Sequence, residues 1–338
     1  MPSPLSRLAA APSFEAFLAA AQPVIESELG RVSRGVPEGF LRPFARYQMA
    51  SGGKRMRPAL ALLAGIGFGA APVRVLPFAA ACEILHNFFL VHDDIEDGDV
   101  VRRDRPALWA RFGLAHGVNA GDFLLALALE TLLSVPAPDA VRARLLREFL
   151  FVLRRTILGQ ALDIEHRGGK GLTVGLWRRI VGFKTGDYLA LALTGPAILA
   201  GISPATIGAL RAAGRDLGIA FQAADDRLDL SPGKGRGGAV GGDIREGKPS
   251  ILAARALAAL HGRDHSRLRS ILAKPRERTG PADVRWAAAA FERTGATAFA
   301  DRTARTLAAR GLARLARLRP SRLDLFEGFV RMVVERTR

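Results

Sequence analysis

The sequence contains one cysteine among 338 residues, together with only two tyrosines and three tryptophans. The single thiol, Cys82, excludes an internal disulfide, and we expect it to be a small buried side chain in a protein of a reducing compartment. No uninterrupted apolar run reaches the roughly 18 residues of a membrane span. The nearest candidate, 188–202, is broken by Thr194, Gly195 and Pro196, so it predicts a buried core helix. The first thirty residues also lack a secretory apolar segment, so we expect a soluble, cytoplasmic protein.

Alternating strand patterns of useful length are lacking as well, whereas leucine and alanine dominate the apolar residues. Apolar residues recur at helical spacing almost throughout, and glycine, proline, serine or aspartate marks the breaks. We predict an all-α fold in a single domain over 1–338, with a flexible glycine-rich loop at about 231–242. Helices are expected at 13–30, 38–50, 57–68, 74–97, 119–135, 138–166, 174–184, 187–201, 204–230, 249–260, 264–273, 282–294, 296–318 and 321–336.

Acidic residues are outnumbered, with 32 Asp and Glu against 49 Lys and Arg, which gives a net charge of +17. Such a balance is compatible with nucleic acid, an anionic membrane or anionic small molecules as partners. The arginines are mostly scattered at helical spacing, as over 302–317, and neither a basic tail nor a nucleic-acid motif is present. We therefore expect solvated helix faces and no binding of nucleic acid.

Two acidic clusters share the form D-D-x-x-D, namely DDIED at 93–97 and DDRLD at 225–229. In each cluster the first and last aspartates are four residues apart and share a helix face, where like charges are destabilising. Aspartate is also a poor interior helix former, and the dipole disfavours acids near a helix C-terminus. Two identical clusters after apolar helical runs therefore indicate function rather than stability.

Carboxylates grouped on one face suit hard cations, and Mg²⁺ prefers one or two carboxylates together with substrate phosphates. The metal interpretation therefore predicts phosphate-bearing substrates, whose remaining partners would be basic residues near the clusters. Such residues stand at 54–57 after a Gly-Gly turn, at 102–103, at a glycine-interrupted helix junction at 183–186, and at 248. Together they predict a site for two diphosphates, one held through metal and one by direct cationic contacts.

These motifs resemble those of the all-trans isoprenyl diphosphate synthases, or polyprenyl synthetases, of the short-chain type. The matching segments occur in family order and span most of the chain: GGKRMRP at 52–58, ILHNFFLVHDDIED at 84–97, RR at 102–103, GQALD at 159–163, KTG at 184–186, FQAADDRLD at 221–229 and GDIREGK at 242–248.

The resemblance implies an isoprenoid synthase-type helical bundle around a deep central cavity, usually in a homodimer, with the two aspartate motifs facing each other across that cavity. It implies a Mg²⁺-dependent 1′-4 condensation of isopentenyl diphosphate with an allylic diphosphate, dimethylallyl or geranyl, with farnesyl as a further starter. Three Mg²⁺ ions are expected with substrate bound.

The resemblance also assigns roles to individual residues. Asp93, Asp97 and Asp225 would ligate Mg²⁺, supported by Asp94, Asp226 and Asp229. Arg102 would bind the allylic diphosphate, and Lys184, Thr185, Gln222 and Lys248 would line its site. Isopentenyl diphosphate would be bound by Gly53, Lys54, Arg57, His86 and Arg103.

The length of the product is expected to depend on Phe88 and Phe89, which precede Asp93 by five and four residues. At about 1.5 Å per residue, they lie roughly one helical turn below the metal site, where bulky rings would close the floor of the cavity. In the family, aromatic residues here limit the product to short chains. The pair favours farnesyl diphosphate (C15) over geranylgeranyl diphosphate (C20), although both rings could also be ordinary core.

One departure from the family concerns the glycine-rich loop, where relatives usually carry a lysine near the position of Gly238 or Ala239. Lys234 or Arg236 could replace it, or the contact is absent. Glu96, which lies within the first cluster, and Asp99, which follows it, are interpreted as bystanders.

Two alternative functions stay open. A class I terpene cyclase would carry an N-D-x-x-S-x-x-x-E type of second motif, and a non-catalytic partner subunit would lose one aspartate motif. This chain retains both aspartate motifs.

Overall fold

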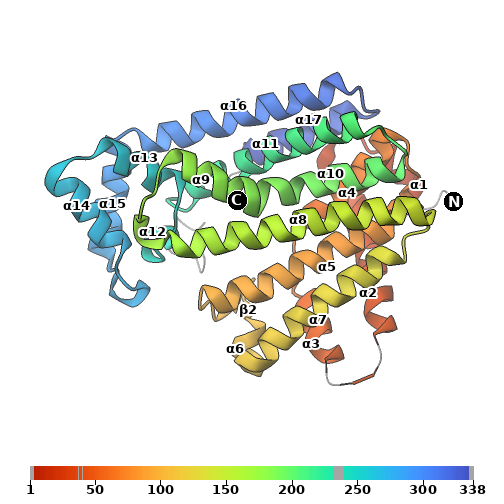
Figure 1. The fold of residues 1–338 in the computed structure, drawn as a ribbon, viewed down its shortest axis with the longest axis horizontal. Helices are drawn as coiled ribbons and strands as arrows, with labels where there is room; N and C mark the ends of the chain where they lie inside the picture. Colours follow the sequence, from red (N-terminus) through yellow and green to blue (C-terminus); the bar gives the residue numbers. More distant parts are fainter. Residues whose placement is uncertain (1–3, 37, 40, 232–239, 335–338) are drawn as a thin grey trace. The chain divides into compact units, whose positions relative to one another are not determined.

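A computed structural model describes residues 4–36, 38, 39, 41–231 and 240–334. Over these residues the protein is almost entirely helical, which confirms the predicted all-α class, and its single two-stranded hairpin was not predicted (Figure 1). The glycine-rich loop, with Lys234, Arg236, Gly238 and Ala239, lies largely outside the described residues.

The chain forms two compact units, each built from several segments. Unit 1 comprises Met1–Leu150, Leu191–Arg211 and Leu315–Phe329, and unit 2 comprises Phe151–Ala190, Ala212–Arg314 and Val330–Arg338. Five helices contribute residues to both units: α8 (Asp139–Glu165), α10 (Asp187–Leu199), α11 (Pro204–Leu228), α16 (Ala296–Arg317) and α17 (Leu323–Val334).

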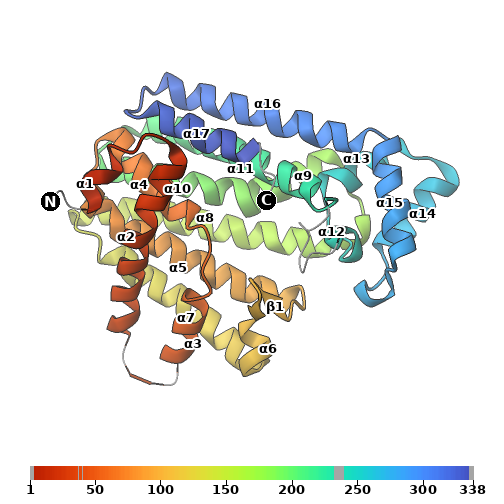
Figure 2. The same cartoon turned by 180° about the vertical axis from the view of Figure 1, so that it is seen from behind.

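Unit 1 is organised around α5, which packs against α4 and α7. Helices α2 and α3 pack on α5 as well, and the view from behind shows α2 beside α4 and α5 (Figure 2). The elements are α1 (Pro4–Leu8), α2 (Phe14–Gly35), α3 (Arg42–Met49), α4 (Met56–Phe68), α5 (Pro72–Glu96), β1 (Val101–Arg102), β2 (Arg105–Pro106), α6 (Leu108–Phe112) and α7 (Leu114–Leu133).

Unit 2 contains α9 (Val174–Val181), a π-helical turn η2 (Gly182–Gly186), α12 (Gly242–Arg245), α13 (Ile251–Ala259), α14 (Gly262–Leu272) and α15 (Pro281–Arg293). Two short 3₁₀ turns, η1 (Arg167–Gly169) and η4 (Arg276–Arg278), also lie among its described residues. Helices α14 and α15 contact each other and both α12 and α13, and α13 also contacts α9.

Helix α5 is apolar on nearly all sides, and it is therefore buried in the core of unit 1. It begins with Pro72 at its first position, where the missing N–H costs no hydrogen bond. By length and composition it is the one described helix that could cross a membrane, but 67% of its most apolar window is buried inside the protein. It therefore has the character of the core helix of a globular protein.

Candidate active site

The first aspartate cluster occupies the last turn of α5 and its C-cap. The amide of Gly98 donates to the Ile95 carbonyl (3.2 Å), and that of Asp99 donates to the Asp94 carbonyl (2.8 Å). This pair of bonds is a Schellman motif, and it needs the left-handed conformation that Gly98 adopts (φ 66°). The turn ends the helix directly after Asp97 and folds Asp99 back beside the cluster.

Arg102 neutralises this cluster from the adjacent hairpin. Its Nε donates to Asp94 Oδ1 (2.6 Å), and its Nη2 lies 3.7 Å from Asp93 and 3.6 Å from Asp99. Burial raises the pKa of Asp94 to about 6, although Arg102 opposes the shift. Asp99, which was interpreted as a bystander, is buried and pairs with Arg102, so it belongs to the ionic network of this cluster; its functional role stays a prediction.

A tight hairpin turns the two adjacent arginines in different directions. β1 pairs with β2 through Arg102 and Arg105, so Arg103 and Asp104 form a two-residue turn. Both turn residues have positive φ (52° and 60°), as a type I′ turn requires. Arg105 Nη1 and Tyr47 Oη anchor the hairpin by donating to the carbonyls of Ala50 (2.9 Å) and Pro106 (2.7 Å).

Arg103 reaches the glycine turn that precedes α4. Its guanidinium donates to the Gly52 carbonyl and lies 3.3 Å from Ser51 Oγ. A Cβ on Gly53 would meet this guanidinium at 2.7 Å, so the close approach depends on glycine. The structure therefore brings together Gly53 and Arg103, two of the residues expected to bind isopentenyl diphosphate.

His86 and Arg57 form a second contact at the same place. Arg57 Nη1 lies 3.2 Å from His86 Nε2, on α4 and α5 respectively. Burial, together with nearby arginines including Arg57 and Arg103, lowers the pKa of His86. This shift favours a neutral imidazole, which can accept from Arg57. Lys54, three residues before Arg57, is exposed.

The second aspartate cluster ends α11, and its middle acid is deeply buried. Asp226 accepts hydrogen bonds from Gln222 Nε2 (2.9 Å), Trp177 Nε1 (3.1 Å) and the amide of Ile251 (2.8 Å). Burial raises the pKa of Asp226 to about 7, which these donors oppose. Asp226 thus anchors α11 to α9 and α13, and Trp177 carried no signal in the sequence that marked it as a partner.

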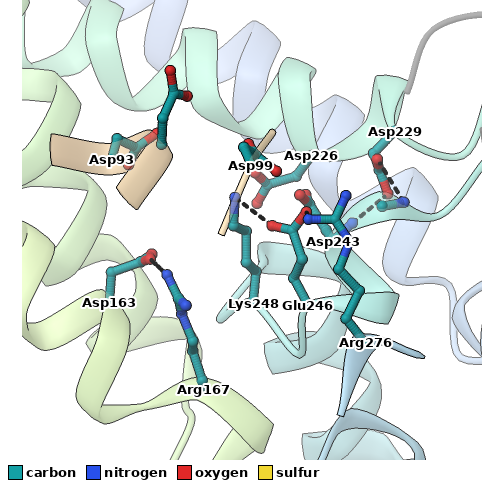
Figure 3. A network of polar contacts seen from close by, with 12 residues as sticks. Asp93, Asp99, Asp163, Arg167, Asp226, Asp229, Asp243, Glu246, Lys248 and Arg276 are labelled. Carbon is teal, nitrogen blue, oxygen red and sulfur yellow. Dashed lines mark hydrogen bonds and ion pairs between the residues drawn. The ribbon is translucent and has the colours of Figure 1, made fainter. Parts of the chain in front are cut away.

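The last acid of this cluster, Asp229, caps α12. Its two carboxylate oxygens accept from the amides of Gly242 (3.0 Å) and Asp243 (3.1 Å), as drawn in Figure 3. Burial raises the pKa of Asp229 and, still more, that of Asp243, where Asp229 adds to the shift. Asp243 belongs to the GDIREGK motif, but it was not assigned a role from the sequence.

The KTG motif lies in the π-helical turn η2, which joins α9 and α10. The predicted helix break at this glycine junction was therefore wrong, since the helix continues through a wider turn. Thr185 Oγ1 donates to Gln222 Oε1 (3.3 Å), and Lys184 Nζ lies 3.7 Å from Asp163 Oδ2. π-Turns often occur at functional sites, and this one brings together three of the expected allylic-site residues.

Two glycines allow η2 to approach α11 so closely. A Cβ on Gly218 would lie 2.6 Å from the Gly186 Cα and 2.9 Å from the Thr185 carbonyl oxygen. Such contacts are impossible for any larger residue without a shift of the backbone. Gly218 is therefore required for this packing, whereas a Cβ on Gly186 would meet the Arg215 carbonyl oxygen at 3.0 Å. The close approach of the two elements places Thr185 beside Gln222.

Lys248 forms an ion pair with Glu246, whose other oxygen faces Arg276. The Lys248 Nζ to Glu246 Oε2 distance is 2.7 Å, and Arg276 Nη1 lies 3.4 Å from Glu246 Oε1 (Figure 3). Glu246 and Arg276 were not identified from the sequence, because their partnership joins α12 to a segment about 30 residues away.

Phe88 and Phe89 lie with their ring centroids 4.9 Å apart, and the Phe88 ring also contacts His92 (4.8 Å). Phe88 is buried, whereas Phe89 is partly exposed. Phe89 precedes Asp93 by four residues and so shares its helix face. Their role in chain length stays a prediction.

No group of three or more His, Cys, Asp or Glu side chains among the residues that the structure describes could hold a metal ion unaided. The donor sets are carboxylates, which are the ligands that Mg²⁺ takes, and Mg²⁺ characteristically shares its shell with substrate phosphates. The residues present therefore fit a cation that binds together with a diphosphate.

Comparison with known proteins gives a consistent result. The family model described as polyprenyl synthetase matches residues 38–290. A short chain isoprenyl diphosphate synthase from Methanothermobacter thermautotrophicus is 36% identical over 274 residues, which cover 80% of this chain and 81% of the relative. Other curated relatives are named as geranylgeranyl, geranylfarnesyl and (2E,6E)-farnesyl diphosphate synthases.

Solved structures show the same fold. Geranylgeranyl pyrophosphate synthetase from Pyrococcus horikoshii matches with a TM-score of 0.85 and 29% identity, over 96% of this chain and 98% of that one. A geranylgeranyl pyrophosphate synthase from Corynebacterium glutamicum, complexed with isoprenyl diphosphate and magnesium, matches with a TM-score of 0.82 and 27% identity, over 94% and 98% of the two chains. The chain belongs to the polyprenyl synthetase family and is a prenyltransferase, a short-chain trans-prenyl diphosphate synthase.

Proposed function

We propose that this enzyme condenses isopentenyl diphosphate with an allylic diphosphate, dimethylallyl or geranyl, by a 1′-4 linkage. The product we favour is farnesyl diphosphate, with geranylgeranyl diphosphate second. The observation that carries this proposal is the divergence of two adjacent arginines. Arg102 is directed to the first aspartate cluster, and Arg103 to the glycine turn beside Lys54, as two separate diphosphates would require.

We propose Asp93, Asp97 and Asp225 as the residues that hold Mg²⁺, with three ions bound when substrate is present. When bound, the ions would neutralise the diphosphate and stabilise the charge that develops as it departs. Asp94, Asp226 and Asp229 support them from inside the protein, since Asp226 and Asp229 already accept bonds from neighbouring groups. Lys184, Thr185, Gln222 and Lys248 would line the allylic site.

The proposed reaction breaks the bond between C1 of the allylic substrate and its diphosphate oxygen, which leaves with the electron pair. The double bond of isopentenyl diphosphate then attacks C1 through its C4, which forms the new carbon–carbon bond. A proton lost from C2 regenerates a double bond, and the released diphosphate accepts it. Arg102 stabilises the leaving anion, and the apolar residues of α5 keep water from the cation.

We propose that the enzyme is a homodimer and that α7 forms its interface. Leu114, Val118 and Leu133 are large apolar residues on α7 with exposed fractions of 56%, 39% and 52%. Their spacing places them along one stripe of the helix, which a second copy of the same chain could cover symmetrically. We further take 1–338 as one catalytic domain that works in the cytoplasm, with neither nucleic acid nor membrane as a partner.

The test is a product analysis of the purified enzyme in Mg²⁺. Labelled isopentenyl diphosphate is incubated with each of the C5, C10 and C15 allylic diphosphates, and the dephosphorylated products are separated by length. We expect extension of the C5 and C10 starters, with C15 as the main product. Failure to condense any of the three starters would refute the proposed function.

A further inference from the structure

One arginine of the GGKRMRP motif is turned inward, although its neighbours Lys54 and Arg57 are expected to meet substrate. The Arg55 side chain is only 1% exposed, and all three of its nitrogens are engaged. Nε donates to Glu26 Oε1 (2.7 Å), Nη1 to Glu83 Oε1 (2.5 Å), and Nη2 to the Met49 carbonyl (2.8 Å). A guanidinium held in this way cannot also reach a diphosphate.

The backbone of Arg55 is strained in the same place. It is the N-cap of α4 and has φ 48° and ψ 35°, a left-handed conformation that non-glycine residues rarely adopt. Such a conformation persists only where the surroundings fix it. The three hydrogen bonds of the guanidinium fix it here, and they thereby set the directions in which Lys54 and Arg57 leave the chain.

Glu83 is the buried acid at the centre of this arrangement. Its side chain is 3% exposed, and burial raises its pKa while Arg55, Arg57 and Arg103 all lower it. Glu83 stands three residues before His86 on α5, so the two side chains share a helix face. The start of α4 is therefore joined to α5 twice, by Arg55 with Glu83 and by Arg57 with His86.

We propose that the buried pair of Arg55 and Glu83 is a positioning device for the second substrate. The pair holds Lys54, Arg57 and Arg103 close together before the diphosphate arrives. Arg55 and these three cations would repel one another and spread apart without the buried acid Glu83. This inference rests on the proposed assignment of the site to isopentenyl diphosphate, and it makes Arg55 and Glu83 positioning residues rather than ligands.

The experiment replaces Glu83 by glutamine, which keeps its size and removes its charge. The KM for isopentenyl diphosphate is measured at saturating allylic diphosphate, and the KM for the allylic substrate at saturating isopentenyl diphosphate. We expect Glu83→Gln to raise the first KM about tenfold, to leave the second within twofold, and to change kcat little, because only one site loses its preorganisation. Simple electrostatics predicts the opposite sign, since a more positive site would bind an anion more tightly.

Glu148→Gln is the matched control. Glu148 is also a buried acid of unit 1, and it pairs with Arg211 and accepts from Thr194 (2.9 Å), but it belongs to neither aspartate motif nor to the basic run. We expect neither KM to change in this variant. Equal changes in both KM values for both variants would mean a general loss of stability and would overturn the inference.

A second variant keeps the test decisive if Glu83→Gln does not fold. Arg55→Lys retains the charge but has a single nitrogen, which cannot reach the three separated acceptors that the planar guanidinium spans, so it should raise the KM for isopentenyl diphosphate selectively as well. Wild-type enzyme that forms no product from isopentenyl diphosphate would refute the proposed function itself. Normal wild-type kinetics with an unchanged or lowered KM in the variants would refute only the positioning role.

Discussion

The two aspartate clusters have the same sequence spacing but very different surroundings. In unit 1, the second aspartate, Asp94, is held by the full charge of Arg102. In unit 2, Asp226 has the same place in its motif, but it is held by the neutral donors of Gln222, Trp177 and a backbone amide. Burial raises the pKa of both, to about 6 and about 7. The second aspartate of the same motif is thus held by an ion pair in one cluster and by neutral hydrogen-bond donors in the other.

This difference suggests a division of labour between the clusters. Arg102 is a partly exposed cation, whose guanidinium can bind a substrate phosphate as well as a carboxylate. The donors around Asp226 are locked in helices and cannot move in this way. We infer that Arg102 of the first cluster also contacts the substrate, whereas the second cluster is held in a fixed position by its hydrogen bonds. Both clusters would complete a metal site only when diphosphate is present.

The largest expected effect comes from removing one of the proposed metal ligands from either cluster. Asp93→Asn and Asp225→Asn should each lower kcat by about 10²–10³-fold, because each weakens the stabilisation of the departing diphosphate. Steady-state rates of product formation give the comparison. Asp216→Asn is the control on the same helix as Asp225, since Asp216 pairs with Arg310 and Arg314 outside the motif. If only one cluster proved sensitive, the two would not be equivalent metal sites.

A smaller effect, on the KM for the allylic diphosphate, should distinguish Arg102 beside the first cluster from the neutral donor Gln222 beside the second. Arg102→Met should raise the KM for the allylic diphosphate about 10- to 100-fold, because a charge-assisted contact of about 1.5–3 kcal/mol is lost. Gln222→Met should raise it less, since it removes a neutral amide. Initial rates at varied allylic concentration measure both. A greater effect of Gln222→Met would contradict the assignment of Arg102 as the shared cation.

The free energy of unfolding should depend on the single hydrogen bond that the neutral indole of Trp177 donates to Asp226. Trp177→Phe leaves one oxygen of buried Asp226 without its indole partner and should lower the free energy of unfolding by about 1–3 kcal/mol. Trp109→Phe is the counterpart in the first region, where the indole donates to the Asp99 carbonyl (2.9 Å) from a less buried position. Urea denaturation of both variants compares them. A larger loss for Trp109→Phe would argue against Asp226 as an anchor.

The smallest expected effect is on product length rather than on rate. Each cluster has a phenylalanine four residues upstream, Phe89 and Phe221. Phe89→Ala should lengthen the product by about one isoprene unit, whereas Phe221→Ala should leave the length distribution unchanged. Chromatography of labelled products reads out both. An unchanged distribution in Phe89→Ala would remove the basis for the predicted C15 product.

Much of this site could be predicted from the sequence, because its first determinants are local. Both aspartate clusters follow apolar runs of helical spacing, and the structure places both at helix ends. The resemblance predicts different partners for Arg102 and Arg103, and the hairpin turn directs the two side chains to different parts of unit 1. The contacts of Arg103 with the glycine turn and of Arg57 with His86 agree with their assignment to one site.

The sequence does not predict which side chains meet through tertiary packing. Asp99 was dismissed because nothing local shows that a Schellman turn folds it back onto Arg102. The KTG segment was taken for a break, since a π-turn and a helix end both tolerate glycine. Arg55 and Lys54 are neighbours of like charge, and the tertiary partners Glu83, Glu26 and the Met49 carbonyl explain why Arg55 points inward.

The most direct test of the shared-ligand account is a calorimetric titration of Mg²⁺ into the wild-type enzyme, with and without inorganic diphosphate. The account predicts weak binding of Mg²⁺ alone and at least about tenfold tighter binding with diphosphate, a coupling that must be reciprocal. Asp93→Asn and Asp225→Asn should each reduce the gain in Mg²⁺ affinity that diphosphate causes. Binding of Mg²⁺ that is equally tight without diphosphate would contradict the claim that protein and substrate complete the metal site together.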